Sequence, residues 1–555
     1  QLYAGSNVNG KTGTSSLESL RYNIDNTLTY NRSFGDHRIN AMVGMTIGQT
    51  INKSSTLSAS DIDEQQWQSG SINAAHKLDP YYYDESKFSS LSFMARMVYS
   101  FKDRYVVTAT VRADGSSKFA KGNKFSYFPS FAFAWRVNQE KFLETAYWLT
   151  NLKLRLGWGM VGNQALSPYQ TRVNYGSNLY GTHYGDSNYE VGVSPNNLPN
   201  PDLRWETTQQ YNAGIDLGLL NDRINLVVDL YDKRTKDLLQ NISISPSSGY
   251  SKMWVNRGEI QNRGLEISAD FVPVKTKKVT WNIGGNISFN RNKITDIGLD
   301  RQEGAEYAYF MGANIGTSNF FRQPANIFIQ GRPMGLFWGY KTNGIVQEGE
   351  AAPTWNGSEQ PAGSVKFVDM TGDNDITTED MTIIGNPNPK FTYGFSTSVS
   401  FYRFTFDMVF NGVYGNQIAN GNLMNETNVD KDNKNNIRRD AFYKAWTPEN
   451  PNTNYPALRQ YSQYNTFTDR IVEDGSFLRL ANISLSYSVP VNKSKKSWCK
   501  ALNVSFSAKN ILTVTNYSGW DPEVSSYGNN IMKMGVDMNS YPNFKSYVIG
   551  INVTF

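Results

Sequence analysis

The acidic stretch DMTGDNDITTED, residues 369–380, has the spacing of a metal-binding loop. Oxygen-bearing side chains at alternate positions, closed by a carboxylate at the twelfth, are typical of an EF-hand calcium loop. Here those candidate ligands are Asp369, Thr371, Asp373, Asp375 and Asp380. The stretch departs from the pattern at Asn374, which stands where the turn normally has glycine. The sequence therefore leaves two interpretations open, a structural Ca²⁺ site or a solvated acidic turn.

Other patterns that could support nucleotide binding or catalysis are weak. GWGMVG (157–162) matches a dinucleotide-binding glycine spacing. However, the alternation over Leu152–Met160 predicts a strand, so no helix N-terminus would hold a pyrophosphate. The three histidines lie far apart in the sequence, and no order of Ser, His and Asp resembles a hydrolase motif. We therefore expect no enzyme activity and no required cofactor.

Tyrosines are better candidates for ligand contacts. Five of them lie among Gly, Ser and Asn in segments that we interpret as loops: Tyr81, Tyr82, Tyr83, Tyr180 and Tyr184. Aromatic faces beside amide groups can hold sugar rings or peptide backbones. The alternative is that these rings pack loops together or belong to an aromatic girdle. We predict that the five tyrosines bind substrate.

Composition restricts the class of protein. Mean hydropathy is −0.51 and 39% of residues are hydrophobic, and no apolar run is long enough for a transmembrane helix. A membrane β-barrel would still escape such a scan, because only alternate residues of its strands face lipid. The aromatic content of 14% suits the girdles of such a barrel. The 54 basic and 49 acidic residues are interspersed, so we expect no nucleic-acid partner.

Hydrophobic and polar residues alternate along much of the chain, which is the period of a strand. Such segments number about fifteen, most of them of roughly 8 to 13 residues, a length that suits a tilted bilayer crossing. They lie at 20–30, 39–47, 91–101, 105–113, 131–137, 152–160, 211–219, 224–230, 265–271, 279–289, 391–401, 404–410, 477–487, 502–506 and 546–555. The expected fold class is an all-β, transmembrane antiparallel β-barrel.

Short turns alternate with long loops between these segments. The expected long loops are 51–88, 162–205, 291–388, 416–475 and 513–545. Outer-membrane barrels have short turns on the periplasmic side and long loops outside. An odd number of strands is unusual for such a barrel. We therefore interpret residues 1–555 as the C-terminal part of a single larger barrel domain.

Eight sequence blocks follow one another from about residue 90 to the end. They are RADGSSKF (112–119), FPSFAFAWRV (128–137), LKLRLGWGMVGNQ (152–164), LPNPDLRWETT (198–208), GRPMGLFWGYKTNGIVQ (331–347), IIGNPNPKFTYGF (383–395), FLRLANISLSYSVP (477–490) and AKNILTVTNYSGWDPEV (508–524). In content and order they resemble the SusC/RagA family of TonB-dependent outer-membrane transporters. Residues 1–90 resemble the family less distinctively.

The resemblance implies a plugged barrel of roughly twenty-two strands, of which this chain would carry about fifteen, without the plug and the TonB-contacting segment. It implies TonB-dependent active import of a bulky nutrient, an oligosaccharide or an oligopeptide. The implied partners are a SusD-like surface lipoprotein, the TonB–ExbB–ExbD complex and the lipid of a Gram-negative outer membrane. It also implies that the terminal aromatic residue, here Phe555, is read during barrel assembly.

Two other functions remain open at this point. The chain could form a passive outer-membrane channel or a barrel that does not transport, which would need no plug. It could also be a surface glycan-binding β-protein, which would stay dispersed without detergent. The choice between glycan and peptide is also left open, because both present hydrogen-bonding and partly apolar surfaces.

Overall fold

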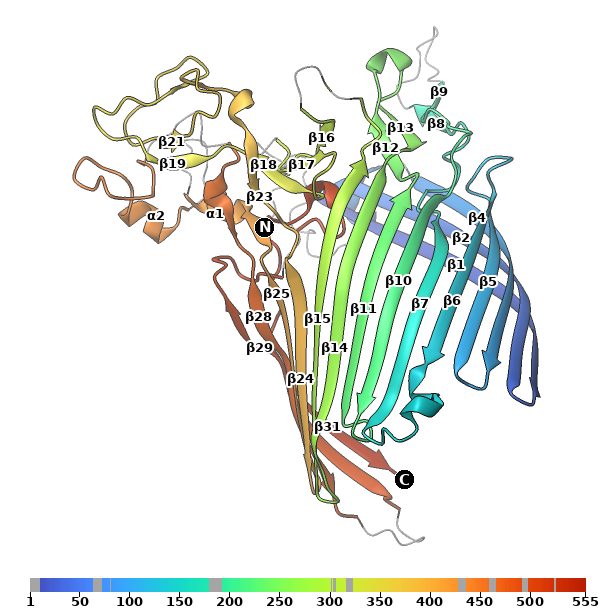
Figure 1. Ribbon diagram of the computed structural model, residues 1–555. Coiled ribbons are helices and arrows are strands. Elements are labelled where there is room, and N and C mark those ends of the chain that lie inside the picture. The colour runs from blue at the N-terminus through green and yellow to red at the C-terminus, as the bar shows by residue number, and fades with distance from the viewer. Residues whose placement is uncertain are drawn as a thin grey trace. The chain divides into compact units, whose positions relative to one another are not determined.

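Long antiparallel strands dominate the computed structural model, which describes residues 10–62, 72–79, 81–178, 192–300, 302, 306–315, 323–427, 436–458, 466–491, 498–523 and 526–555. Fifteen of the strands follow one hydrogen-bonded path (Figure 1). In order along the sheet they are β1 (Lys11–Phe34), β2 (His37–Ile62), β4 (Tyr82–Phe101), β5 (Tyr105–Ser116), β6 (Phe125–Arg136), β7 (Leu149–Asn163), β10 (Glu206–Leu219), β11 (Ile224–Lys236), β14 (Glu259–Lys275), β15 (Val279–Asp296), β24 (Phe391–Phe401), β25 (Phe404–Tyr414), β28 (Phe477–Val489), β29 (Ala501–Thr515) and β31 (Ser546–Thr554).

Each predicted segment lies in one of these strands, except that Val137 and Phe555 fall one residue beyond the ends of β6 and β31. The all-β class and the strand count are therefore confirmed for the described residues. The strands follow chain order in the sheet, as sequential antiparallel hairpins require. A further strand, β3 (Ala75–Leu78), pairs with β2. The predicted alternation therefore identified the strands of the sheet.

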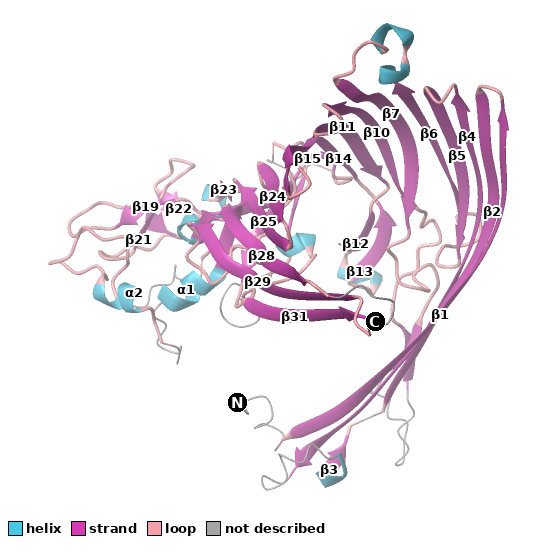
Figure 2. Cartoon of the chain, turned by 90° about the horizontal axis from the view of Figure 1, so that it is seen from below, coloured by secondary structure: helices cyan, strands magenta, loops and turns pink. Residues whose placement is uncertain are grey.

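Small sheets and short helices lie in the connections. The strands are β8 (Tyr175–Asn178), β9 (Gly192–Pro195), β12 (Leu239–Ser243), β13 (Lys252–Asn256), β16 (Tyr309–Met311), β17 (Asn326–Ile329), β18 (Leu336–Gly339), β19 (Thr342–Ile345), β20 (Thr354–Trp355), β21 (Val365–Phe367), β22 (Asp375–Ile376), β23 (Thr382–Gly385), β26 (Gln417–Asn420), β27 (Val472–Asp474) and β30 (Val536–Asp537). The helices are α1 (Gly421–Thr427) and α2 (Arg439–Tyr443), with single 3₁₀ turns elsewhere (Figure 2). Neither these helices nor any other in the described part of the chain is long and apolar enough to cross a membrane.

The chain divides into two compact units. The first contains Gln1–Trp135, Leu156–Tyr211 and Thr235–Arg257. Its connections have their own hydrophobic cluster, formed by Phe119, Phe128, Leu166, Leu203 and Trp205. The Trp205 indole donates a hydrogen bond of 3.1 Å to the carbonyl oxygen of Lys124. This cluster packs the LPNPDLRWETT block against the segment that follows β5.

The second unit contains Arg136–Arg155, Asn212–Arg234 and Gly258–Phe555. Large hydrophobic side chains share one face of its neighbouring strands: Phe401 pairs with Phe404, and Phe404 pairs with Tyr487 across the next strand. Phe401 and Phe404 are exposed, as is Leu485 nearby. The opposite face is polar and carries Asp407, which accepts a hydrogen bond from a serine. An exposed apolar face of this extent is typical of strands that face lipid.

Short turns and long connections alternate along most of the described chain, as predicted, but the connection 117–124 before β6 is shorter than the connection 137–148 after it. The observed long connections differ in their bounds: β2 continues to Ile62 and β4 starts at Tyr82, so the predicted loop 51–88 is mostly strand. The β1–β2 register continues unbroken to the pair Lys11 and Ser60. Alternation could not reveal this extension, because most residues there are polar and do not follow a period of two. Besides the backbone pairing, side-chain hydrogen bonds such as Ser19 to Asn52 hold the strands together. The other predicted loops shift by only a few residues, and β15, for example, continues to Asp296.

Candidate functional site

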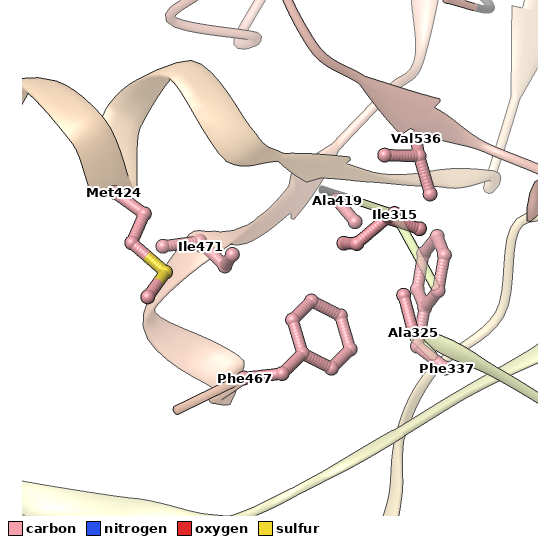
Figure 3. Close-up of a cluster of buried hydrophobic side chains, with 8 residues drawn as sticks. All are labelled: Ile315, Ala325, Phe337, Ala419, Met424, Phe467, Ile471 and Val536. Carbon is pink, nitrogen blue, oxygen red and sulfur yellow. The ribbon is translucent and has the colours of Figure 1, made fainter. Parts of the chain in front are cut away.

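Three long connections of the second unit share one hydrophobic core. They are the segments between β15 and β24, between β25 and β28, and between β29 and β31. Side chains from all three converge in Figure 3: Ile315, Ala325, Phe337, Ala419, Met424, Phe467, Ile471 and Val536. β26 also pairs with β27 and with β30, which joins two of the connections by main-chain hydrogen bonds. The connections therefore form one packed body.

A buried arginine anchors this body to the sheet. Arg479 of β28 has a side chain that is 4% exposed and forms an ion pair with Asp521. Its Nη1 also lies 2.6 Å from Oε2 of Glu523, and its Nε donates to Oγ1 of Thr513. Arg479 belongs to the FLRLANISLSYSVP block, and the two acidic residues belong to the AKNILTVTNYSGWDPEV block. The ion pairs of Arg479 with Asp521 and Glu523 therefore join two of the sequence blocks to each other.

The electrostatics of the anchored connection are set by burial and hydrogen bonding. Burial by itself raises the pKa of Asp521, but hydrogen bonds from the Glu523 N–H and from Arg479 outweigh it and leave the pKa below its usual value. Burial also raises the pKa of Tyr517, helped by its 2.7 Å hydrogen bond to Asp537. Both groups therefore keep their ordinary charge states near neutral pH.

An amide-lined pocket of about 630 Å³ lies at the rim of the second unit. Its amide side chains come from the end of β15, the segment before β24 and the segment after β25: Asn290, Asn292, Asn386, Asn388, Asn416 and Gln417. Hydrogen bonds hold several of them in place. Asn292 donates to Asn388 Oδ1 over 2.6 Å and accepts from the N–H of Met334, and Gln417 Oε1 accepts from the Asn386 N–H. The wall is thus preorganised.

Charged and aromatic groups complete the pocket lining. Arg291, Lys390, Asp474 and Tyr414 all contribute to it. Neither Arg291 nor Lys390 forms an ion pair with a described carboxylate, and the Lys390 ammonium lies 5.9 Å from the centroid of the Tyr414 ring. Asn416 Oδ1 is buried and makes no hydrogen bond within the described part of the chain. The pocket therefore offers donors, acceptors and one aromatic face to a polar ligand.

Three of the five predicted tyrosines lie in the described part of the chain. Tyr81, Tyr82 and Tyr83 are all exposed. Tyr82 and Tyr83 belong to strand β4 and not to a loop, so the predicted loop position is wrong for these two. Tyr83 donates a hydrogen bond of 2.9 Å to Glu85. Tyr180 and Tyr184 lie outside the described residues, so the predicted tyrosine contacts stay predictions.

The acidic stretch forms a tight turn whose carboxylates accept hydrogen bonds from backbone N–H groups. Asp369 accepts from the N–H groups of Gly372 and Asn374, at 2.6 and 2.8 Å. The hydrogen bond from Gly372 is also the main reason why the pKa of Asp369 lies below its usual value. Asp375 accepts from the Gly357 N–H, which likewise lowers the pKa of that carboxyl. The two carboxylates therefore have separate hydrogen-bond partners.

Asp380 is fully buried and accepts hydrogen bonds from the N–H groups of Met370, Thr371 and Thr377. It caps the 3₁₀ turn Thr378–Asp380. Asp373 and Thr371 are exposed. Within the described ranges no group of three or more His, Cys, Asp or Glu side chains could hold a metal ion. The hydrogen bonds explain the acidic spacing, and calcium binding here stays a prediction that this geometry does not support.

The glycine-rich segment GWGMVG lies within strand β7 (Leu149–Asn163). The expectation that no helix begins there is confirmed. His37 contacts Tyr99, with 2.7 Å between Nδ1 and the hydroxyl oxygen, and its ring lies tilted beside that of Phe101 with centroids 5.0 Å apart. The amide pocket, by contrast, was missed by sequence reasoning. The only signal for it was the block IIGNPNPKFTYGF, which contributes Asn386, Asn388 and Lys390 to the lining.

The family model described as TonB dependent receptor-like, beta-barrel, matches residues 1–511. The chain belongs to this family. It is 31% identical over 567 residues to TonB-dependent receptor P3 of Formosa agariphila. The alignment covers 100% of this chain and 54% of that protein. It is also 30% identical over 475 residues to TonB-dependent receptor SusC of Bacteroides thetaiotaomicron. That alignment covers 84% of this chain and 44% of SusC.

Among solved structures, that of the RagAB peptide transporter superimposes with a TM-score of 0.80 and 25% identity, over 98% of this chain and 56% of the matched chain. The predicted resemblance to the SusC/RagA group of TonB-dependent receptors is therefore confirmed. This TonB-dependent receptor chain spans about half the length of the curated relatives that it matches. The blocks around Arg479 and Asp521 are parts of the receptor barrel and its connections.

Proposed function

We propose that the whole protein imports a bulky nutrient, a glycan or peptide oligomer, across the outer membrane of a Gram-negative bacterium. TonB–ExbB–ExbD would drive the import, and a SusD-like surface lipoprotein would deliver the nutrient. The observation that supports this most strongly is the similarity to the RagAB peptide transporter over 98% of the chain. The match to SusC agrees with it. The function would be transport and not catalysis.

The packed body of connections supports the same proposal. A receptor must present a defined surface to its nutrient, and a shared hydrophobic core keeps long loops from fluctuating independently. The pocket lined by Asn292, Asn388 and Lys390 is one preorganised part of that surface. Tyr81, Tyr82, Tyr83, Tyr180 and Tyr184 are proposed as further contacts to the nutrient.

Uptake by cells tests this proposal. We would supply fluorescent maltooligosaccharides and a fluorescent peptide digest separately to cells with the gene, cells without it, and cells with the gene but without TonB. Uptake of one of the two probes should require both the gene and TonB. Uptake that requires the gene and persists without TonB would instead identify a passive channel. Co-purification of a surface lipoprotein from the same cells tests the partner.

A further inference from the structure

Part of the edge of β15 is left open at the amide pocket. The β15–β24 register ends at the pair Ser288 and Thr392. The next main-chain hydrogen bonds on this side of β15 are made by Ile294, whose N–H donates to Arg332 and whose carbonyl oxygen accepts from Gly331. Between these two points the strand has no neighbouring strand on this side among the described residues.

Two residues occupy this gap. In a strand, the N–H and C=O groups of every second residue point to the same side. The main-chain groups of Asn290 and Asn292 therefore point to the same side of β15 as those of Ile294. Both residues line the pocket. In the described structure, Arg291 Nη1 donates to the carbonyl oxygen of Asn290 over 3.3 Å and to that of Lys390 over 3.0 Å. Apart from the contact at Asn290, the main-chain N–H and C=O groups of Asn290 and Asn292 form no hydrogen bond on this side within the described part of the chain.

We propose that this pocket binds an extended oligopeptide, whose main chain pairs with the open edge of β15 at Asn290 and Asn292. The inference rests on the proposed import function and names the substrate class. An added peptide strand repeats its donors and acceptors at the spacing of the strand it joins, which a sugar chain does not. Arg291 and Lys390, which form no ion pair with a described carboxylate, and the carboxylate of Asp474 can attract the charged ends of a short peptide.

N-methylated peptides provide the sharpest test. A pool of mixed-sequence hexapeptides, the same pool N-methylated at alternate positions, and maltohexaose would each be dialysed against the whole purified protein in detergent. Bound material would be measured by mass spectrometry. We expect the unmodified pool to bind and N-methylation to weaken binding by about tenfold, because methylation removes the main-chain donors. Maltohexaose should not compete with the peptides.

Two substitutions inside the pocket and one control outside it locate the binding. Arg291→Gln should weaken retention of the unmodified pool, whereas Lys293→Gln should not, because Lys293 lies on the same strand but outside the pocket. A cysteine introduced by Lys390→Cys should react with a maleimide, and the peptide pool should slow that reaction. All three variants retain β15 and its register with β14, so heat-modifiable migration should match the parent.

Several outcomes would overturn the inference. Equal retention of both peptide pools would show that main-chain pairing is not involved. Retention of maltohexaose in competition with peptides would make the substrate a glycan. A Lys390→Cys protein that stays unreactive without peptide would show that another part of the whole protein fills the pocket. Each of these results leaves TonB-dependent uptake unaffected, so failure here is distinct from failure of the import proposal.

Discussion

The guanidinium of Arg479 and the carboxylate of Asp521 form an ion pair in which the two side chains are only 4% and 5% exposed. The pair joins strand β28 to the connection between β29 and β31. Because both charges are buried, each depends on the other for compensation. Asp521 also accepts hydrogen bonds from the N–H groups of Glu523 and Asn543.

Arg479→Met should therefore free the connection 516–545. Removing one partner of a buried pair leaves an uncompensated charge and costs about 3–5 kcal/mol. We expect much faster proteolysis of this segment in isolated outer membranes, and a smaller effect when Asp521→Asn is added. Arg204→Met is the control, because the exposed pair of Arg204 with Asp237 contributes about 1 kcal/mol or less. Equal proteolysis of parent and Arg479→Met would contradict the anchoring role.

The same contact predicts a pH dependence. The folded-state pKa of Asp521 is below its usual value, so its stabilisation is present above the unfolded pKa of about 3.9 and is lost as pH falls through the folded value. Protease resistance of 516–545 should thus be constant from about pH 5 to 8 and fall below about pH 4. A loss of resistance near pH 6 would point to a different group.

Gly214 of β10 has no side chain, which leaves space for an ion pair between the strands on either side of β10. Arg155 of β7 lies 2.9 Å from Asp229 of β11 and 2.7 Å from Asp216 of the intervening β10. A Cβ atom at Gly214 would lie 2.7 Å from the guanidinium carbon of Arg155. Gly214→Ala should therefore lower the temperature at which the barrel loses heat-modifiable migration.

The matched control for this change is Gly285→Ala in β15. An added Cβ there would meet only a carbonyl oxygen at 3.7 Å, an ordinary contact. Its backbone conformation is also compatible with alanine. The Gly285→Ala protein should migrate like the parent at every temperature. If the two substitutions lower the transition temperature equally, the general effect of replacing a strand glycine, and not the displaced ion pair, would explain the change caused by Gly214→Ala.

The acidic turn should depend on Asp380 and not on calcium. Asp380→Ala leaves three N–H groups without their acceptor, at a cost of about 1–3 kcal/mol for each that stays unsatisfied. Proteolysis within 365–385 should become faster, while the exposed Asp373→Ala should behave like the parent. Digestion in Ca²⁺ and in EDTA should proceed at equal rates. Protection by Ca²⁺ that both substitutions remove would instead establish the metal site.

Phe555 stacks on Trp498, with ring centroids 5.7 Å apart and 30° between the planes. Both rings are exposed, which suits an aromatic girdle at the membrane interface. We propose that this pair closes the end of β31 during assembly. Deleting Phe555 should lower the outer-membrane abundance of the heat-modifiable protein, and Trp498→Ala should do so less severely. Phe555→Tyr should be mild, because the ring remains amphipathic. Normal abundance after deletion would contradict an assembly role.

Alternation of hydrophobic and polar residues was enough to locate the strands of the sheet. In the second unit one face of each strand is apolar and the other polar, so alternation follows directly from the two environments. The signal disappeared where most residues are polar and do not follow a period of two, which is why the extension of β2 to Ile62 and the start of β4 at Tyr82 were missed. The blocks around Arg479 and Asp521 could be found, but not the contact between them.

Which residues of the long connections become neighbours could be seen only in the folded chain. Asn290, Asn388 and Asn416 are ordinary polar residues in the sequence, and they line one pocket only because three distant segments pack together. The acidic turn shows the same limit. The spacing of Asp369 and Asp380 suggested a shared metal ion, but in the folded turn each carboxylate accepts hydrogen bonds from its own backbone N–H groups. Hydropathy patterns report the environment of a side chain, whereas a binding site depends on directions and distances that only the folded backbone establishes.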